Sequence, residues 1–235
     1  MKGAKLTACL TALLLCWSSG AQVLRDKWSH EVSAGGGYCT NENFTIELSY
    51  FYFPFSFKYI GFGSYLGMHA STKDREVPYG PVKSTTDFNE WILTSSHTKV
   101  TGLTLTPSVL LETPALKIHA LKISLRAIPG MNLTIPRERV EAEFREVKAD
   151  KPVDFSNYKY QYFWLSGNQW VSWSGRFTLH FAIDELCFGL GYSMSNYDIW
   201  STRRNGSIEG TSFSEFYPEQ RPLYHYFFVY TAWKF

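Results

Sequence analysis

A histidine and a serine two positions apart, in His69-Ala70-Ser71, are the first residues that could do chemistry. On a strand such a pair shares one face, and the imidazole could activate the hydroxyl if an acidic side chain oriented it. No acidic residue stands at a spacing that completes this set. The chain also has no HExxH pattern, no P-loop and no GxGxxG segment after a strand. We therefore expect a protein without enzymatic activity.

Cysteines and histidines form no metal-binding pattern, because no CxxC pair or His/Cys cluster occurs. The sequence predicts no metal and no cofactor. Cys39 and Cys187 remain after the first twenty-one residues, and they are compatible with a disulfide or with two separate thiols in strands.

Several ionisable residues alternate with apolar ones. In Trp173–Ile183, apolar side chains alternate with Arg176, Thr178 and His180, a period of two that predicts a strand with one polar face. The same analysis places six ionisable residues on inward, polar faces: Glu31, Glu47, Lys122, Arg126, Arg176 and His180. Buried charges must be paired. We expect the two glutamates to neutralise the lysine and the two arginines.

Eight segments share this alternation, and short and long gaps between them follow a regular order. The predicted strands are 30–39, 43–53, 56–69, 99–111, 115–128, 173–183, 186–195 and 223–235. The three long gaps fall on every second connection, as in a barrel with short turns on one side of a membrane and long loops on the other. A tight turn is predicted at Glu112-Thr113-Pro114, and a bulge within 115–128. If 137–148 and 158–164 also cross, the barrel has ten strands, but their charges favour eight.

The composition supports a membrane-embedded sheet. Of the 235 residues, 17% are aromatic and 19% are charged, and the net charge of +2 gives no reason to expect nucleic-acid binding. Aromatic rings suit the membrane–water interface. The girdle expected from this consists of Tyr38, Tyr50, Trp173, Tyr192 and Trp233, for which a sugar-binding platform is the alternative.

The N-terminus is typical of an export signal. Lys2 and Lys5 precede an apolar run from Leu6 to Trp17, and Ser19-Gly20-Ala21 supplies small residues for cleavage. We expect a signal peptide over 1–21 and one mature domain over 22–235. A lipoprotein anchored at Cys16 is the alternative.

The last strand ends in Phe235, with apolar or aromatic residues at alternating positions before it: Phe227, Val229 and Trp233. This closely resembles the closing strand of small bacterial outer-membrane β-barrel proteins of the opacity and attachment-porin type. The resemblance implies an all-β, closed antiparallel transmembrane barrel located in the outer membrane. It also implies that these four residues form an assembly signal for the barrel-assembly machinery, and that outer-membrane lipid surrounds the barrel.

A barrel of eight strands is just wide enough to be filled by side chains. We therefore expect a structural or surface-interaction protein with a filled lumen, whose aromatic-rich loops meet an external protein or glycan. A narrow porin or small-solute transport barrel is the alternative, and a lipid-modifying enzyme that uses His69 and Ser71 is less favoured.

Overall fold

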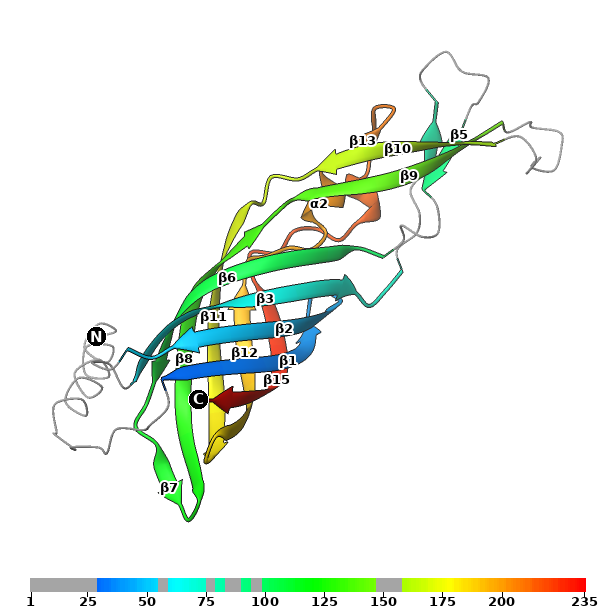
Figure 1. Ribbon diagram of the computed structural model, residues 1–235. Coiled ribbons are helices and arrows are strands. Elements are labelled where there is room, and N and C mark those ends of the chain that lie inside the picture. Colours follow the sequence, from blue (N-terminus) through cyan, green and yellow to red (C-terminus); the bar gives the residue numbers. More distant parts are fainter. Residues whose placement is uncertain (1–28, 55–58, 75–78, 83–89, 94–98, 147–157) are drawn as a thin grey trace, which may run out of the picture.

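The computed structural model describes residues 29–54, 59–74, 79–82, 90–93, 99–146 and 158–235, and the expected signal peptide lies outside them. Eight antiparallel strands form a closed barrel (Figure 1). They are β1 (His30–Cys39), β2 (Asn43–Tyr52), β3 (Ile60–Ser71), β6 (Thr101–Glu112), β8 (Leu121–Thr134), β11 (Val171–Ile183), β12 (Leu186–Ser195) and β15 (Tyr224–Lys234). The all-β fold with eight barrel strands is confirmed.

The ring closes between the first strand and the last. Each strand pairs with its sequence neighbour in the ring, and β15 then pairs with β1, for example at Gly35 and Tyr230. The amide of Phe235 donates to the carbonyl of His30 at 2.9 Å, so the pairing runs to the end of the chain. Closure leaves the barrel without a sheet edge.

The strands alternate between two very different faces. In β2, Asn43, Thr45, Glu47 and Ser49 point into the barrel and are buried together with Phe51, while the intervening apolar and aromatic side chains point outward and stay exposed. The outward set surrounds the barrel and includes Ile46, Leu48, Phe62, Leu66, Met68, Leu103, Leu105, Leu125, Phe177, Phe188, Leu190, Phe227 and Val229. Alternate residues therefore place polar side chains inside and apolar side chains outside, which is the reverse of the arrangement in soluble proteins.

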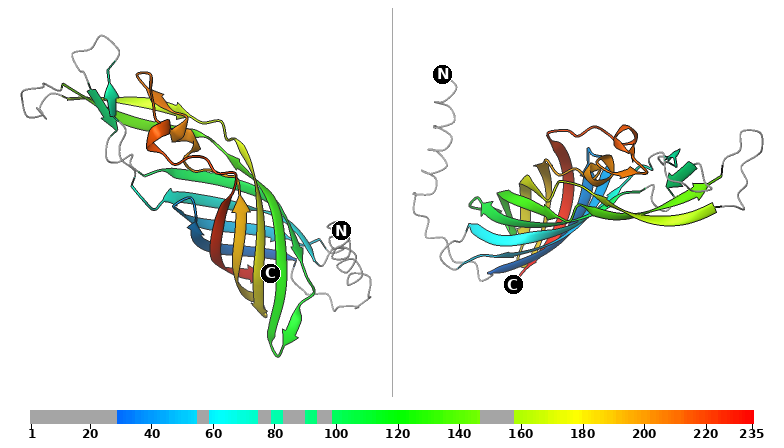
Figure 2. Two further views of the ribbon diagram at one scale, coloured as in Figure 1. Left: turned by 180° about the vertical axis from the view of Figure 1, so that it is seen from behind. Right: turned by 90° about the horizontal axis from the view of Figure 1, so that it is seen from above.

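All three long connections lie at one end of the barrel (Figure 2). The first contains β4 (Tyr79–Pro81) and β5 (Glu90–Leu93), and the second contains β9 (Arg137–Arg145) and β10 (Tyr158–Ser166). The third contains α2 (Ser201–Arg204), β13 (Ser207–Ile208), β14 (Thr211–Ser212) and the 3-10 helix η2 (Ser214–Phe216). No helix among the described residues is long and apolar enough to cross a bilayer.

The predicted strand 115–128 is wrong in its boundaries. The tight turn lies at His119-Ala120, where His119 has a positive φ of 57°, and not at Glu112–Pro114. Leu116–Ile118 forms β7, which pairs with the start of β8 as a hairpin below the barrel. Lys117 is out of phase because it belongs to the strand before the turn, so the phase change comes from this hairpin.

The segments considered for a ten-stranded barrel lie outside the ring. β9 and β10 continue β8 and β11 beyond the barrel, pair with each other, and join β5 and β4 in a separate four-stranded sheet. Pro136, which has no amide hydrogen, stands where β6 and the β8–β9 segment separate. The last β6–β8 pair is Thr104 with Thr134.

Gly37 is a point where barrel closure can be tested. A Cβ atom at this position would collide with the backbone of Phe227 on β15, whereas a Cβ at Gly175 would meet nothing within 4 Å. We predict that Gly37→Ala lowers the free energy of unfolding by roughly 1–3 kcal/mol, the usual cost of overpacking. The measurement is urea unfolding of protein refolded in detergent micelles. Gly175→Ala is the matched control, and equal effects of the two changes would contradict the closure.

Candidate functional site: the barrel lumen and the external cap

The upper half of the lumen is crossed by a bidentate ion pair. Arg176 on β11 donates from both terminal nitrogens to the carboxylate of Glu47 on β2, each at 2.6 Å. The guanidinium lies 4.0 Å from the ring centroid of Tyr65 and 5.4 Å from that of Phe228. Two parallel hydrogen bonds and two flanking rings hold the arginine in one orientation.

A second cluster of charges crosses the lower half. Arg126 on β8 donates to both oxygens of Glu31 at 2.7 and 2.8 Å, and to Glu112 at 3.0 Å. The ammonium of Lys234 lies 3.8 Å from Glu31. Both arginines and both of their principal glutamates are buried. Two tiers of paired charge therefore link strands on opposite sides of the barrel.

Aromatic rings from β15 fill much of the space between these tiers. Phe228 and Tyr230 point inward, beside glycines on the neighbouring strands β12 and β1. A Cβ at Gly189 would lie 2.6 Å from the ring of Tyr230. The glycines that alternate with aromatic residues in β12 thus leave room for the rings of β15.

The remaining space inside the barrel is small. A cavity of about 10 Å³ is bounded by Glu31, Glu47, Arg126 and Tyr230, among others. About one water molecule needs this much room.

The other two residues of the expected charge cluster lie near the lower tier. The Nδ1 atom of His180 is 2.8 Å from the hydroxyl of Tyr230, and the two rings stack. Lys122 lies half-buried near the lower end of β8, opposite Ala182 of β11. The sequence analysis assigns Glu112 to a turn and therefore does not predict it as a lumen residue. Glu112 lies an even number of residues after Thr104 and Thr106, and this spacing indicates that it shares their inward face.

The four residues expected to form the assembly signal share the outward face of the last strand. Phe227, Val229, Trp233 and Phe235 are all exposed, at 49–65% of their surface. This places them in the outward apolar band, with Phe235 at the lower end of the barrel.

The residues that could have supported catalysis are not brought together. The ring nitrogens of His69 lie 2.8 Å from the hydroxyl of Thr45 and 3.0 Å from that of Thr104. The hydroxyl of Ser71 instead accepts the amide hydrogen of Val100 at 3.0 Å. Among the described residues, no three His, Cys, Asp or Glu side chains are placed to hold a metal. Cys39 at the end of β1 and Cys187 at the start of β12 are free thiols at opposite ends of the barrel.

The long connections fold together into a compact structure above the barrel, which we call the cap (residues 79–82, 90–93, 99–100, 135–146, 158–170 and 196–217). It has its own hydrophobic core, separate from the lumen. The core contains Trp91, Val100, Val140, Ala142, Phe144, Leu165, Ile199, Trp200, Ile208, Phe213 and Tyr217. Because all three connections contribute, each one holds the other two in place.

Buried ion pairs hold the cap together, and a hydrogen bond joins it to the barrel. Arg203 in α2 is buried and donates to Glu138 of β9, from Nε at 2.9 Å. Burial by itself would lower the pKa of Arg203, but the hydrogen bond and charge of Glu138 raise it above its ordinary value. Asp198 pairs with Arg204 and accepts a hydrogen bond at 3.0 Å from Asn41, in the β1–β2 turn. The sequence analysis identified none of these residues, because no local pattern pairs them.

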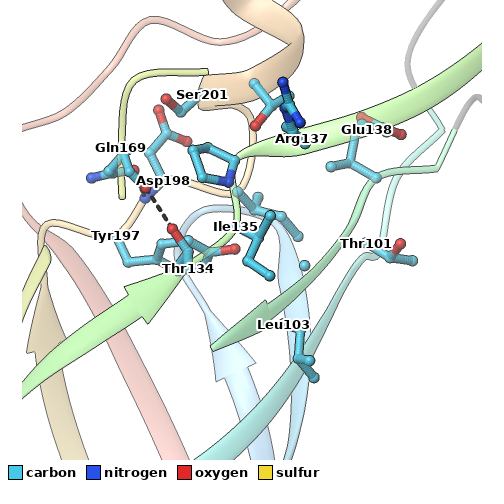
Figure 3. A pocket seen from close by; sticks show the side chains of 15 residues that line it. Thr101, Leu103, Thr134, Ile135, Arg137, Glu138, Gln169, Tyr197, Asp198 and Ser201 are labelled. Atoms are coloured by element: carbon cyan, nitrogen blue, oxygen red, sulfur yellow. Dashed lines mark hydrogen bonds between the residues drawn. The ribbon is translucent and has the colours of Figure 1, made fainter. Parts of the chain in front are cut away.

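A crevice opens on the outside of the barrel where β6 and β9 separate (Figure 3). Its volume is about 40 Å³. Leu103 and Ile135 form an exposed apolar lip, while Thr101, Gln169 and Ser201 contribute polar groups. The amide of Asp198 donates to the side-chain oxygen of Gln169 at 2.9 Å behind the crevice.

Comparisons with known proteins give only distant likenesses. No family model and no curated protein matches the chain. Neisserial surface protein A is 9% identical, with a TM-score of 0.40, over 88% of this chain and 97% of that one. The N-terminal β-barrel domain of Pseudomonas aeruginosa OprF has the same identity and coverage, with a TM-score of 0.37. The attachment invasion locus protein of Yersinia pestis, in complex with a heparin analogue, is 10% identical with a TM-score of 0.33, over 88% and 98%.

The upper ion pair provides a test of lumen packing. We predict that Glu47→Ala destabilises the barrel by roughly 3–5 kcal/mol, because it leaves the charge of Arg176 buried and unpaired. The double variant Glu47→Leu with Arg176→Leu should recover most of this loss, because no charge is then left buried. Denaturant unfolding of the two variants measures both values. A single variant as stable as the wild type would show that the pair does not hold the lumen.

Proposed function

We propose that the chain is an exported bacterial outer-membrane protein whose barrel carries the cap outside the cell for contact with other molecules. The observation that carries this is the combination of an apolar outer wall with long connections that fold into a separate, well-packed cap at one end.

The outer wall supports the membrane location. Monomeric soluble proteins rarely expose continuous apolar patches larger than a few hundred Å², yet here apolar side chains face outward on every barrel strand. In hydrocarbon, backbone groups must be paired within the structure, and a closed ring of strands meets this need. The proposal includes cleavage of the signal after Ala21 and recognition of the C-terminal strand by the barrel-assembly machinery.

The ion pairs and rings inside the lumen support a structural role for the barrel and not a pore. Arg176 and Glu47, and Arg126 with Glu31 and Glu112, join opposite strands across the interior, and the space between the two tiers holds about one water. A path for solutes would require these pairs to separate and the rings of β15 to move.

The cap offers a surface suited to an external polypeptide. β10 lies at the edge of the four-stranded sheet, and most of its side chains are exposed. Tyr158, Tyr160, Tyr162 and Trp164 lie on its outward face. Unpaired backbone groups along such an edge accept an extended segment of another protein as a further strand. We assign the contact function to this edge and its aromatic face.

Changing β10 tests the contact function. We predict that Tyr160→Lys with Tyr162→Lys abolishes adherence of producing cells to plates coated with serum protein, because charges on an edge strand oppose pairing. Glu215→Gln with Glu219→Gln adds the same charge at exposed positions away from β10 and should leave adherence unchanged. An epitope tag between residues 146 and 158, read by antibody on intact cells, verifies surface display of each variant. Adherence that survives the β10 change on displayed protein would contradict the assignment.

Conductance tests the lumen. Purified wild-type protein in a planar lipid bilayer should give no stable current steps, because two tiers of ion pairs and the rings of β15 cross the interior. Steady conductance of the wild-type protein would favour a transport function.

A further inference from the structure

The crevice between β6 and β9 lies where the apolar outer wall ends. On the strand that runs through β8 into β9, the outward residues from Leu125 to Ile135 are predominantly apolar, and the next two are Arg137 and Arg139. From Leu125 to Ile135 the strand covers roughly 33 Å at about 3.3 Å per residue. At a tilt of about 40° this is roughly 25 Å in height, close to that of a barrel's apolar band. Arg137 therefore lies at the level of lipid headgroups, if the barrel is located as proposed.

The neighbouring strand carries a matching cation. On β6 the outward residue above Leu103 is Thr101, and Lys99 lies two residues before the strand begins; both are exposed. In the β6–β8 register, in which Thr104 faces Thr134, an undivided sheet would place Thr101 opposite Arg137 and Lys99 opposite Arg139. The strands separate at Pro136 instead, so the cations stand on the two sides of the crevice and not directly against each other.

The acidic groups of the crevice are already neutralised. Glu138 is bound by Arg203, and Asp198 is bound by Arg204. Within the described part of the chain, no carboxylate forms an ion pair with Lys99, Arg137 or Arg139. Arg139 stacks on Tyr162 at 3.8 Å. The crevice thus has a net positive mouth above an apolar lip formed by Leu103 and Ile135, which are 59% and 74% exposed.

We propose that the outer mouth of this crevice, where Arg137 lines it and Lys99 and Arg139 flank it, binds the phosphate-bearing headgroup of an outer-leaflet lipid, with an acyl chain against Leu103 and Ile135. Arginine suits phosphate because its guanidinium presents paired donors in a plane. The apolar lip selects a lipid over a free anion, because a free phosphate has nothing to place against these two side chains. The proposal rests on the membrane location proposed above.

Native mass spectrometry of protein refolded in detergent micelles tests this site, with bisphosphorylated lipid A as the probe. We expect the variant Lys99→Gln, Arg137→Gln, Arg139→Gln to bind the probe at least 10-fold more weakly than the wild type. Arg221→Gln removes an exposed cation elsewhere on the external side and should bind as the wild type does. Dephosphorylated lipid A should bind the wild type as weakly as the probe binds the triple variant.

Different results would overturn the lipid site and the membrane location. Equal binding of the probe by the wild type and the triple variant overturns the site, as does equal binding of the phosphorylated and dephosphorylated lipids. Displacement of the lipid by an equal concentration of inorganic phosphate would show an anion site without lipid recognition. Wild-type protein that neither inserts into vesicles nor changes its gel migration on boiling would overturn the membrane location itself. Insertion with no variant effect would overturn only the lipid site.

Discussion

Closure of the sheet is the constraint on which the rest of this structure depends. Each barrel strand must have a neighbour on both sides, so the last strand has to meet the first, and the amide of Phe235 still bonds to β1. Closure requires close backbone approach at Gly37, where a side chain would collide with the facing strand. It also fixes which side chains point inward, because residues alternate along every strand. The position of each lumen charge therefore follows from the register of the closed ring.

Closing the barrel buries charged side chains in the lumen, and ion pairs between them offset the cost. Polar faces that point inward bring several charges into a space too narrow for bulk water, and unpaired charges there would be very costly. Arg176 with Glu47, and Arg126 with Glu31 and Glu112, satisfy one another across the ring. Rings from β15 take up the remaining room beside glycines of the neighbouring strand. The interior is therefore organised as a polar core in two tiers.

The cap buries its apolar side chains in its interior, unlike the barrel, because it lies beyond the apolar outer wall. Its strands and loops need a core of their own, and the burial of Trp91, Trp200 and Phe213 supplies one. Arg203 with Glu138 then joins two of the connections within the cap, and Asp198 with Asn41 joins the cap to the β1–β2 turn at the barrel rim. One end of the molecule thus combines a well-packed cap, the edge strand β10 of the described four-stranded sheet, and a crevice where β9 leaves the barrel.

Alternation by itself determined the eight strands and the inward position of Glu31, Glu47, Arg126 and Arg176, because a period of two is a local property of the chain. The order of short and long gaps between the strands indicated that the long loops share one end. The boundaries of the strand predicted over 115–128 did not follow from the local pattern. A turn at His119, which resembles a continuing strand, can be recognised only from the pairing of β7 with β8. The partners of each charge, the third carboxylate at Glu112 and the cap core were decided by tertiary structure alone. They join residues far apart in the sequence, such as Arg203 and Glu138, which only the closed ring and its folded loops bring into contact.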